Sequence, residues 1–158
     1  MCILNLFKKK TEFPLIKTEP ISRDDYLTVL AKSGIVPLSA TDPLDPLLAL
    51  ASKEDLDIIA PELVYPADYY LTNIWDCEDY ALQAGLDAGR KFGVSVRLCL
   101  GWMELGYHGF ALAMDKTHKI WILENNAGFP HAGKWFAPTL TMDKPLIGDM
   151  YYPVKVFI

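Results

Sequence analysis

The sequence predicts an α+β fold in which helices come first and an antiparallel sheet follows. Apolar and small residues recur at spacings of three and four over residues 76–92, which is the pattern of an amphipathic helix. Residues 94–100 and 108–114 alternate as strands, and residues 120–123 are apolar on both faces, as in a central strand. Residues 153–158 can close the sheet. We therefore expect a central helix packed on an antiparallel sheet.

Composition predicts one domain of ordinary size. The chain has 158 residues, of which 51% are apolar, enough to bury a core. Its net charge of −5, with scattered Lys and Arg, argues against nucleic acid as a partner. No apolar stretch is long enough to span a membrane, and the first ten residues lack the order of a secretory signal. The spacing of Cys2, Cys77 and Cys99 matches no disulfide framework, so we expect reduced thiols and a cytoplasmic protein.

The first third of the chain predicts an arm and two helices. Residues 1–21 form the N-terminal arm, and residues 22–158 form the single domain. Ser22 can cap a helix over residues 23–32, because a serine side chain accepts from the free N–H groups of a first turn. Ser52 predicts a second, shorter helix by the same rule. Between these helices, the proline-rich residues 37–46 predict an irregular connection.

Cys77 is the first candidate for chemistry. If Asp76 caps the helix, Cys77 occupies its first position, where free N–H groups and the helix dipole favour a negative charge. A thiol in such a place can have a pKa well below about 8.5, and the thiolate is the reactive form. The same N–H groups can stabilise an oxyanion.

A nucleophilic cysteine needs a base, and His108 is the best placed of the three histidines. It begins an apolar alternating strand, whereas His118 lies in a predicted turn and His131 in a loop. His131 is the second candidate. A third residue, which orients the imidazole, would come from Glu124, Asn125 or Asn126 at the end of the next strand. An even hairpin loop sets His108 opposite Asn125, and an odd loop sets it opposite Glu124 or Asn126. Each residue alone also fits a structural role, as a buried thiol, a bonded core histidine or a loop start.

Three segments resemble the motifs of the bacterial transglutaminase-like cysteine proteinases, a family of the papain-like and transglutaminase-like superfamily. The segments are Asp76-Cys77-Glu78-Asp79-Tyr80-Ala81, Tyr107-His108-Gly109-Phe110-Ala111-Leu112 and Ile122-Leu123-Glu124-Asn125. The resemblance implies a papain-like/transglutaminase-like core with Cys77 as nucleophile, His108 as general base and acid, and Glu124 where the family has Asp. Asn125 is the alternative third member, as Asn is in papain-like relatives. The resemblance covers about residues 75 to 126.

The resemblance also implies an activity and an ion. A Cys-His-Glu/Asn triad would hydrolyse or transfer amide bonds of a protein or peptide substrate through a thioester, as a peptidase or a transglutaminase. No cofactor is required, but calcium-dependent relatives hold their ion with acidic residues that match Asp76 and Glu78. Helix capping and dipole compensation explain the same acidic residues without a metal.

Residues close to Cys77 and on the neighbouring strands are candidates for a substrate cleft. Asn73, Trp75 and Tyr107 are the main ones, and Tyr70 is a further candidate for the second oxyanion donor.

The alternative function is a degraded papain-like fold that binds protein through an aromatic rim of Trp75, Trp102, Tyr107 and Trp135. A zinc enzyme using Cys77, His108 and another histidine is a poorer interpretation, because no ligand pair has helical or knuckle spacing.

Overall fold

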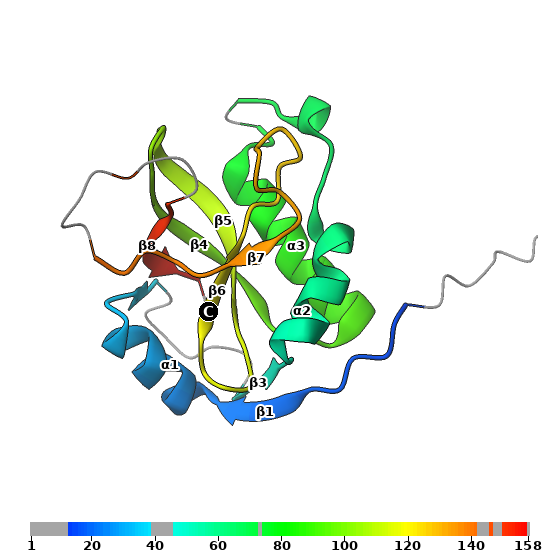
Figure 1. The fold of residues 1–158 in the computed structure, drawn as a ribbon, viewed down its shortest axis with the longest axis vertical. Coiled ribbons are helices and arrows are strands. Elements are labelled where there is room, and N and C mark those ends of the chain that lie inside the picture. Colours follow the sequence, from blue (N-terminus) through cyan, green and yellow to red (C-terminus); the bar gives the residue numbers. More distant parts are fainter. Residues whose placement is uncertain (1–12, 39–45, 73, 142–145, 147–149, 158) are drawn as a thin grey trace, which may run out of the picture.

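A six-stranded mixed sheet lies at the centre of the molecule, in the order β2-β8-β4-β5-β6-β7. A separate two-stranded sheet pairs β1 with β3 (Figure 1). The computed structural model describes residues 13–38, 46–72, 74–141, 146 and 150–157.

The described residues form strands, α-helices and 3₁₀ turns. The strands are β1 (Glu19–Ser22), β2 (Val36–Pro37), β3 (Leu47–Leu50), β4 (Val96–Met103), β5 (Gly106–Met114), β6 (Ile120–Leu123), β7 (Trp135–Phe136) and β8 (Tyr152–Val156). The helices are α1 (Arg23–Lys32), α2 (Lys53–Ile59) and α3 (Cys77–Phe92), with 3₁₀ turns η1 (Ala60–Leu63) and η2 (Ala67–Tyr69).

The central sheet is covered on both faces. Alternation along β5 divides its side chains between two apolar cores: Ala111 and Ala113 face the core made with α2 and α3, while Phe110 and Leu112 face the core made with α1 and β3. Figure 1 shows α2 and α3 together beside the sheet and α1 apart from them. The sheet is therefore the middle of three layers.

Small residues let α3 approach the sheet closely. Ala84 and Ala88 of the helix are fully buried in the same core as Ala111. A Cβ at Gly85 would lie 2.8 Å from the carbonyl oxygen of Val96, so only glycine fits there. This close packing fixes the position of the helix N-terminus relative to β5.

Local sequence signals predicted the helices well. The Ser22 hydroxyl accepts from the N–H of Asp25 at 3.1 Å, and Ser52 does the same for Asp55. Helix α3 ends at Gly93, whose φ of 68° is the left-handed conformation that favours glycine. The three helix predictions are confirmed.

The predicted fold class, an α+β papain-like/transglutaminase-like core on an antiparallel sheet, is wrong for this sheet-rich structure. The sheet is mixed, because β2 runs parallel to β8, and β1 pairs with β3 in a second sheet that was not predicted. A parallel pair needs a long crossover, and here all elements from β3 to β7 lie between β2 and β8 in the chain. Local alternation carries no signal for such a pairing.

Candidate functional site

Cys77 is the first residue of α3, as predicted. Asp76 caps the helix, and the carboxylate of Asp79 accepts a hydrogen bond from the backbone N–H of Asp76 at 3.1 Å. The Cys77 side chain is half-buried and is a free thiol. Its Sγ donates to the Glu78 carboxylate, with 2.9 Å between sulfur and Oε2.

The surroundings of Cys77 disfavour the thiolate. Burial and the hydrogen bond to Glu78 raise the pKa of the Cys77 thiol to about 12, against a lowering effect of the Gly109 backbone N–H. The negative charges of Glu78 and Asp76 act in the same direction as burial. The low thiol pKa expected at a helix N-terminus is therefore not found, because burial and the neighbouring Glu78 and Asp76 carboxylates raise the pKa.

His108 belongs to a buried polar network on β5. Its Nε2 lies 2.8 Å from Oε2 of Glu124, and the Tyr151 hydroxyl donates to the same oxygen at 2.9 Å. The other Glu124 oxygen accepts from the backbone N–H of Asn126 at 2.9 Å. Glu124 is only 1% exposed, so these hydrogen bonds replace all of its contact with water. Phe129 packs against the imidazole, with ring centroids 5.1 Å apart.

The register of β5 and β6 explains which residue reaches His108. Ala111 lies opposite Leu123, so the continued register places His108 opposite Asn126. Glu124 lies diagonally from His108 on the same face of the sheet, and its longer side chain spans the gap. Asn125 points to the other face, where it accepts from the Ala111 N–H at 2.9 Å and donates to the Leu63 carbonyl at 2.8 Å. The Asn125 side chain thus forms hydrogen bonds with two backbone groups on the face opposite to His108.

The N-terminus of α3 abuts β5 where β6 has ended. A Cβ at Gly109 would lie 2.9 Å from the Glu78 nitrogen and 3.1 Å from the Cys77 carbonyl carbon. Hydrogen bonds with Asp76 and Cys77 lower the pKa of the Glu78 carboxyl group, and His108 acts in the same direction. The structure therefore brings Cys77, His108 and Glu124 into one region, although the thiol hydrogen bond goes to Glu78.

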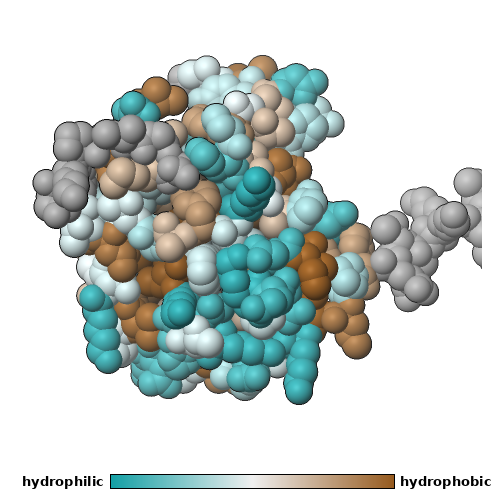
Figure 2. Space-filling view, viewed as in Figure 1, coloured by the Kyte–Doolittle hydropathy of each residue, from teal (hydrophilic) through white to brown (hydrophobic). Residues whose placement is uncertain are grey.

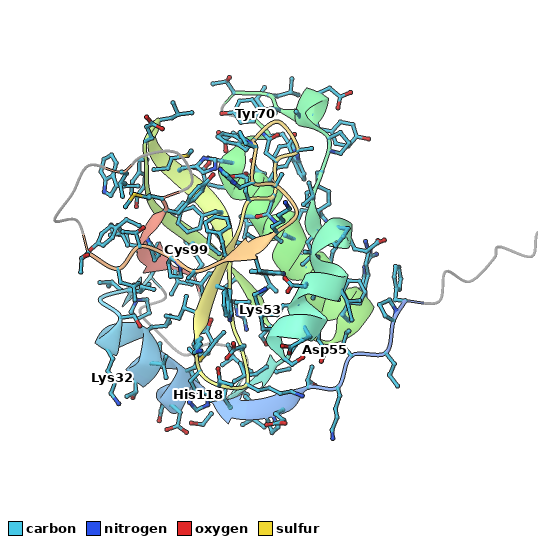
Figure 3. All side chains as sticks on the ribbon, in the orientation of Figure 1. Lys32, Lys53, Asp55, Tyr70, Cys99 and His118 are labelled. Carbon is cyan, nitrogen blue, oxygen red and sulfur yellow. The ribbon has the colours of Figure 1, made fainter. Side chains whose placement is uncertain are left out.

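The other two histidines lie in loops, and one of them, His131, lines a cavity of about 170 Å³ together with Phe129 and Tyr151 of the His108 network. His118 sits in the β5–β6 turn with a positive φ of 62°, and Figure 3 labels it near β1, away from the α3 N-terminus. His131 lies in the loop before β7 and packs against Phe136. The choice of His108 as the base over His118 and His131 stays a prediction.

An open pocket lies beside the N-terminus of α3. It encloses about 550 Å³ and is lined by Asp68, Tyr69, Leu71, Ile74 and Trp75. Trp75 was a predicted cleft residue, whereas the contributions of Asp68, Leu71 and Ile74 were missed. The run of apolar residues before Cys77, in a segment without strand or helix periodicity, was the available signal.

The remaining cleft and rim candidates are dispersed. Tyr107 packs edge-on against Trp102, at 4.9 Å between ring centroids, on the β4–β5 hairpin. Trp135 is buried in the core and donates through Nε1 to the Leu56 carbonyl, so it belongs to no exposed rim. Asn73 lies outside the described residues.

The acidic residues around Cys77 form a compact group. One ligand atom each from Asp76, Cys77 and Glu78 lie within 4.8 Å of one another. A hydrogen bond with Asp76 lowers the pKa of the Glu78 carboxyl group. Calcium takes six to eight oxygen ligands, whereas this group supplies two carboxylates and a soft sulfur. The donor set fits calcium poorly, and calcium binding at Asp76 and Glu78 stays a prediction.

Among the described residues, no helix has the length and apolar character needed to cross a bilayer.

Comparisons with known proteins find a likeness of fold only. No family model matches the chain, and no curated protein does. A solved structure described as a PSL1a–E64 complex shares 14% identity with a TM-score of 0.56, covering 88% of this chain and 51% of that one. Polyporus squamosus lectin, bound to the human-type influenza-binding epitope Neu5Acα2-6Galβ1-4GlcNAc, shares 15% identity with a TM-score of 0.53, covering 88% and 49%. The chain thus spans about half the length of each.

These findings correct the predicted family and activity. Neither structure is described as a transglutaminase-like proteinase, and one is described as a lectin, so the predicted family membership is wrong. The predicted peptidase or transglutaminase activity, and with it the degraded papain-like protein-binding module, is contradicted by the same likeness to a lectin. The raised pKa of Cys77 agrees with this correction. What the comparisons establish is the fold that the chain shares with these structures.

Proposed function

We propose that this chain is a carbohydrate-binding protein whose ligand occupies the pocket between η2 and the start of α3. The observation that carries the proposal is an exposed, mostly apolar pocket of about 550 Å³ with one carboxylate on its wall. Ligand sites commonly enclose about 300–1,000 Å³ and combine apolar walls with a few polar groups.

The lining of this pocket suits a sugar ring. A pyranose has an apolar face of C–H groups, which packs on an aromatic ring, and a rim of hydroxyl groups, which donate hydrogen bonds. Tyr69 is 57% exposed, and the Trp75 indole lines the same pocket. The Asp68 carboxylate can accept from sugar hydroxyls. In Figure 2, tan and brown side chains lie beside hydrophilic ones along the upper rim of the molecule.

The pocket is held in shape before any ligand binds. Leu71 and Trp75 exchange two backbone hydrogen bonds of 2.8 Å each, which close the loop between them. The Tyr80 hydroxyl of α3 donates to the Pro66 carbonyl at 2.7 Å and anchors the preceding turn. Tyr70, labelled at the top of Figure 3, packs against the Tyr80 ring. A preformed site loses less conformational entropy on binding.

The lectin among the similar structures supports the choice of ligand class. That lectin is bound to the epitope Neu5Acα2-6Galβ1-4GlcNAc, which makes this glycan the first ligand to test. The carbohydrate takes the place of the protein or peptide substrate that the sequence suggested. The free thiols of Cys77 and Cys99 support a cytoplasmic location as part of the proposal.

The test is a calorimetric titration of the full chain with this trisaccharide and with Galβ1-4GlcNAc. We expect Trp75→Ala to weaken binding at least about tenfold, because it removes the largest stacking surface. Asp68→Asn should weaken it by a smaller factor. Trp102→Ala is the matched control, since Trp102 is a 43% exposed indole outside the pocket, and it should bind as the wild type does.

A parallel titration uses E64, with which PSL1a forms the complex described above. It tests whether a ligand binds near Cys77 and not in the pocket. Absence of glycan binding would overturn the proposal, as would equal glycan binding by Trp75→Ala and wild type. E64 binding that is lost in Cys77→Ser but kept in Trp75→Ala, without glycan binding, would also overturn it. That result would move the ligand site from the pocket to the region of Cys77 and His108.

A further inference from the structure

In the part of the chain that the structure describes, three buried side-chain donors near α1 have no acceptor. They are the Tyr26 hydroxyl, the Nε of Arg23 and the Nε of Arg97. The great majority of buried polar atoms in proteins are hydrogen-bonded, and each exception calls for an explanation such as a bound water or ion. Burying a donor without a partner destabilises the folded state, because the donor loses its hydrogen bonds to water. A group of three such donors is therefore a sign of a missing acceptor.

The three donors belong to one side of the central sheet. Arg23 and Tyr26 are three residues apart on α1, so they share a face of that helix. Arg97 and Cys99 are two residues apart on β4, so their side chains leave the same face of the sheet. Cys99, labelled in Figure 3, packs in the same core as Tyr26. Burial raises the pKa of the Tyr26 hydroxyl, and the nearby charge of Arg97 acts in the opposite direction.

Positive charge at this place is poorly balanced. Among the described residues, no carboxylate forms an ion pair with Arg97, and Arg23 pairs only with Asp24 at 3.7 Å. The Asp24 side chain is 87% exposed, so solvent weakens that pair. Burial raises the pKa of Tyr26 above its usual range, which keeps its hydroxyl protonated and able to donate. An anion would both accept from these donors and balance the charge of the two arginines.

We propose that Arg23, Tyr26 and Arg97 bind a small tetrahedral oxyanion such as phosphate between α1 and β4. Guanidinium groups match phosphate oxygens in charge and geometry, and the Tyr26 hydroxyl supplies a further donor. Both arginine side chains are half-buried and give access from solvent, whereas Tyr26 is fully buried and forms the inner end of the site. This site is separate from the pocket beside α3 and does not depend on the proposed carbohydrate binding.

The test measures the melting temperature of the full chain in increasing sodium phosphate, with ionic strength held constant by sodium chloride. A ligand that binds only the folded state raises the melting temperature with a saturating concentration dependence. Wild type should show this rise. Tyr26→Phe should raise the half-saturating phosphate concentration about fivefold, since it removes one hydrogen bond. Arg97→Gln should raise it at least tenfold, and Arg90→Gln, which alters a 76% exposed arginine, should leave it unchanged.

Stability without phosphate and the ³¹P resonance of phosphate provide two further tests of the site. Without phosphate, Tyr26→Phe should be as stable as wild type or more so, because it deletes a buried donor that lacks an acceptor. Line broadening of the phosphate ³¹P resonance by wild-type protein should disappear in Arg97→Gln. A melting temperature that is insensitive to phosphate would overturn the proposal. Equal responses of wild type and both site variants, or equal responses to phosphate and chloride, would also overturn it.

Discussion

At the scale of single residues, the protonation of Cys77 is the sharpest consequence of the site geometry. With its pKa raised to about 12, the thiol is almost entirely neutral at pH 8. Compared with a free cysteine of pKa about 8.5, alkylation by iodoacetamide at that pH should be slower by about a thousandfold. Peptide mass spectrometry over a pH series measures the rate at Cys77 separately from the other cysteines. Glu78→Gln removes a charge that raises the pKa, so it should accelerate labelling. Rapid labelling of Cys77 at pH 6 would contradict the prediction and show an activated thiol.

The buried Glu124 carboxylate is the second residue on which much depends. Glu124→Ala would leave His108 Nε2, the Tyr151 hydroxyl and the Asn126 N–H without their acceptor. We expect the free energy of unfolding in urea to fall by about 3 kcal/mol, as when one partner of a buried pair is removed. Glu124→Gln keeps the shape and two acceptor sites on one oxygen, so its loss should be less than half as large. Glu54→Gln, at an exposed position, is the control. A loss below about 0.5 kcal/mol for Glu124→Ala would show that the network contributes little.

At the scale of elements, the contact between α3 and β5 depends on Gly109. An alanine there would bring its Cβ to 2.9 Å from the Glu78 nitrogen, so the helix N-terminus must move. We expect Gly109→Ala to lower the free energy of unfolding by about 2 kcal/mol, a usual cost of overpacking. It should also change the labelling rate of Cys77, because the Gly109 N–H contacts the sulfur.

Gly89→Ala is the matched control for this contact. It lies in α3, and nothing is within 4 Å of the position that its Cβ would take. Alanine should stabilise the helix there by roughly 0.5–1 kcal/mol. If both variants changed stability in the same direction and by the same amount, the close approach at Gly109 would not be the cause.

The helices could be predicted from the sequence, whereas the register between β5 and β6 could not. Serine caps and a terminal glycine located the helices because those signals act within a few residues. The same reasoning found Cys77 at a helix start and His108 on a strand, and left Glu124, Asn125 and Asn126 open. The choice needed the β5–β6 register, which the hairpin loop sets and the residue pattern does not. Tyr151 was missed altogether, since only tertiary packing brings its hydroxyl to Glu124. The family resemblance rested on three short motifs, and the family and activity predicted from them were wrong.

At the scale of the whole molecule, the central sheet joins two apolar cores. Leu30 of α1 and Leu56 of α2 are both fully buried, but they belong to cores on opposite faces of the sheet. Because β5 contributes side chains to both cores, loss of either core should unfold the sheet and thereby the other core. The proposed pocket and the proposed anion site would then depend on one common folding equilibrium.

Leu30→Ala and Leu56→Ala test this coupling between the cores. Each removes a buried leucine, and we expect each to lower the free energy of unfolding by about 3 kcal/mol. Urea unfolding should be followed by tryptophan fluorescence, to which the buried Trp135 of the α2 side contributes, and by far-ultraviolet circular dichroism. If the molecule unfolds as one unit, the two signals give the same midpoint in each variant. In Leu30→Ala, a circular dichroism transition that precedes the fluorescence transition would mean that α1 and its core unfold separately from the rest of the sheet.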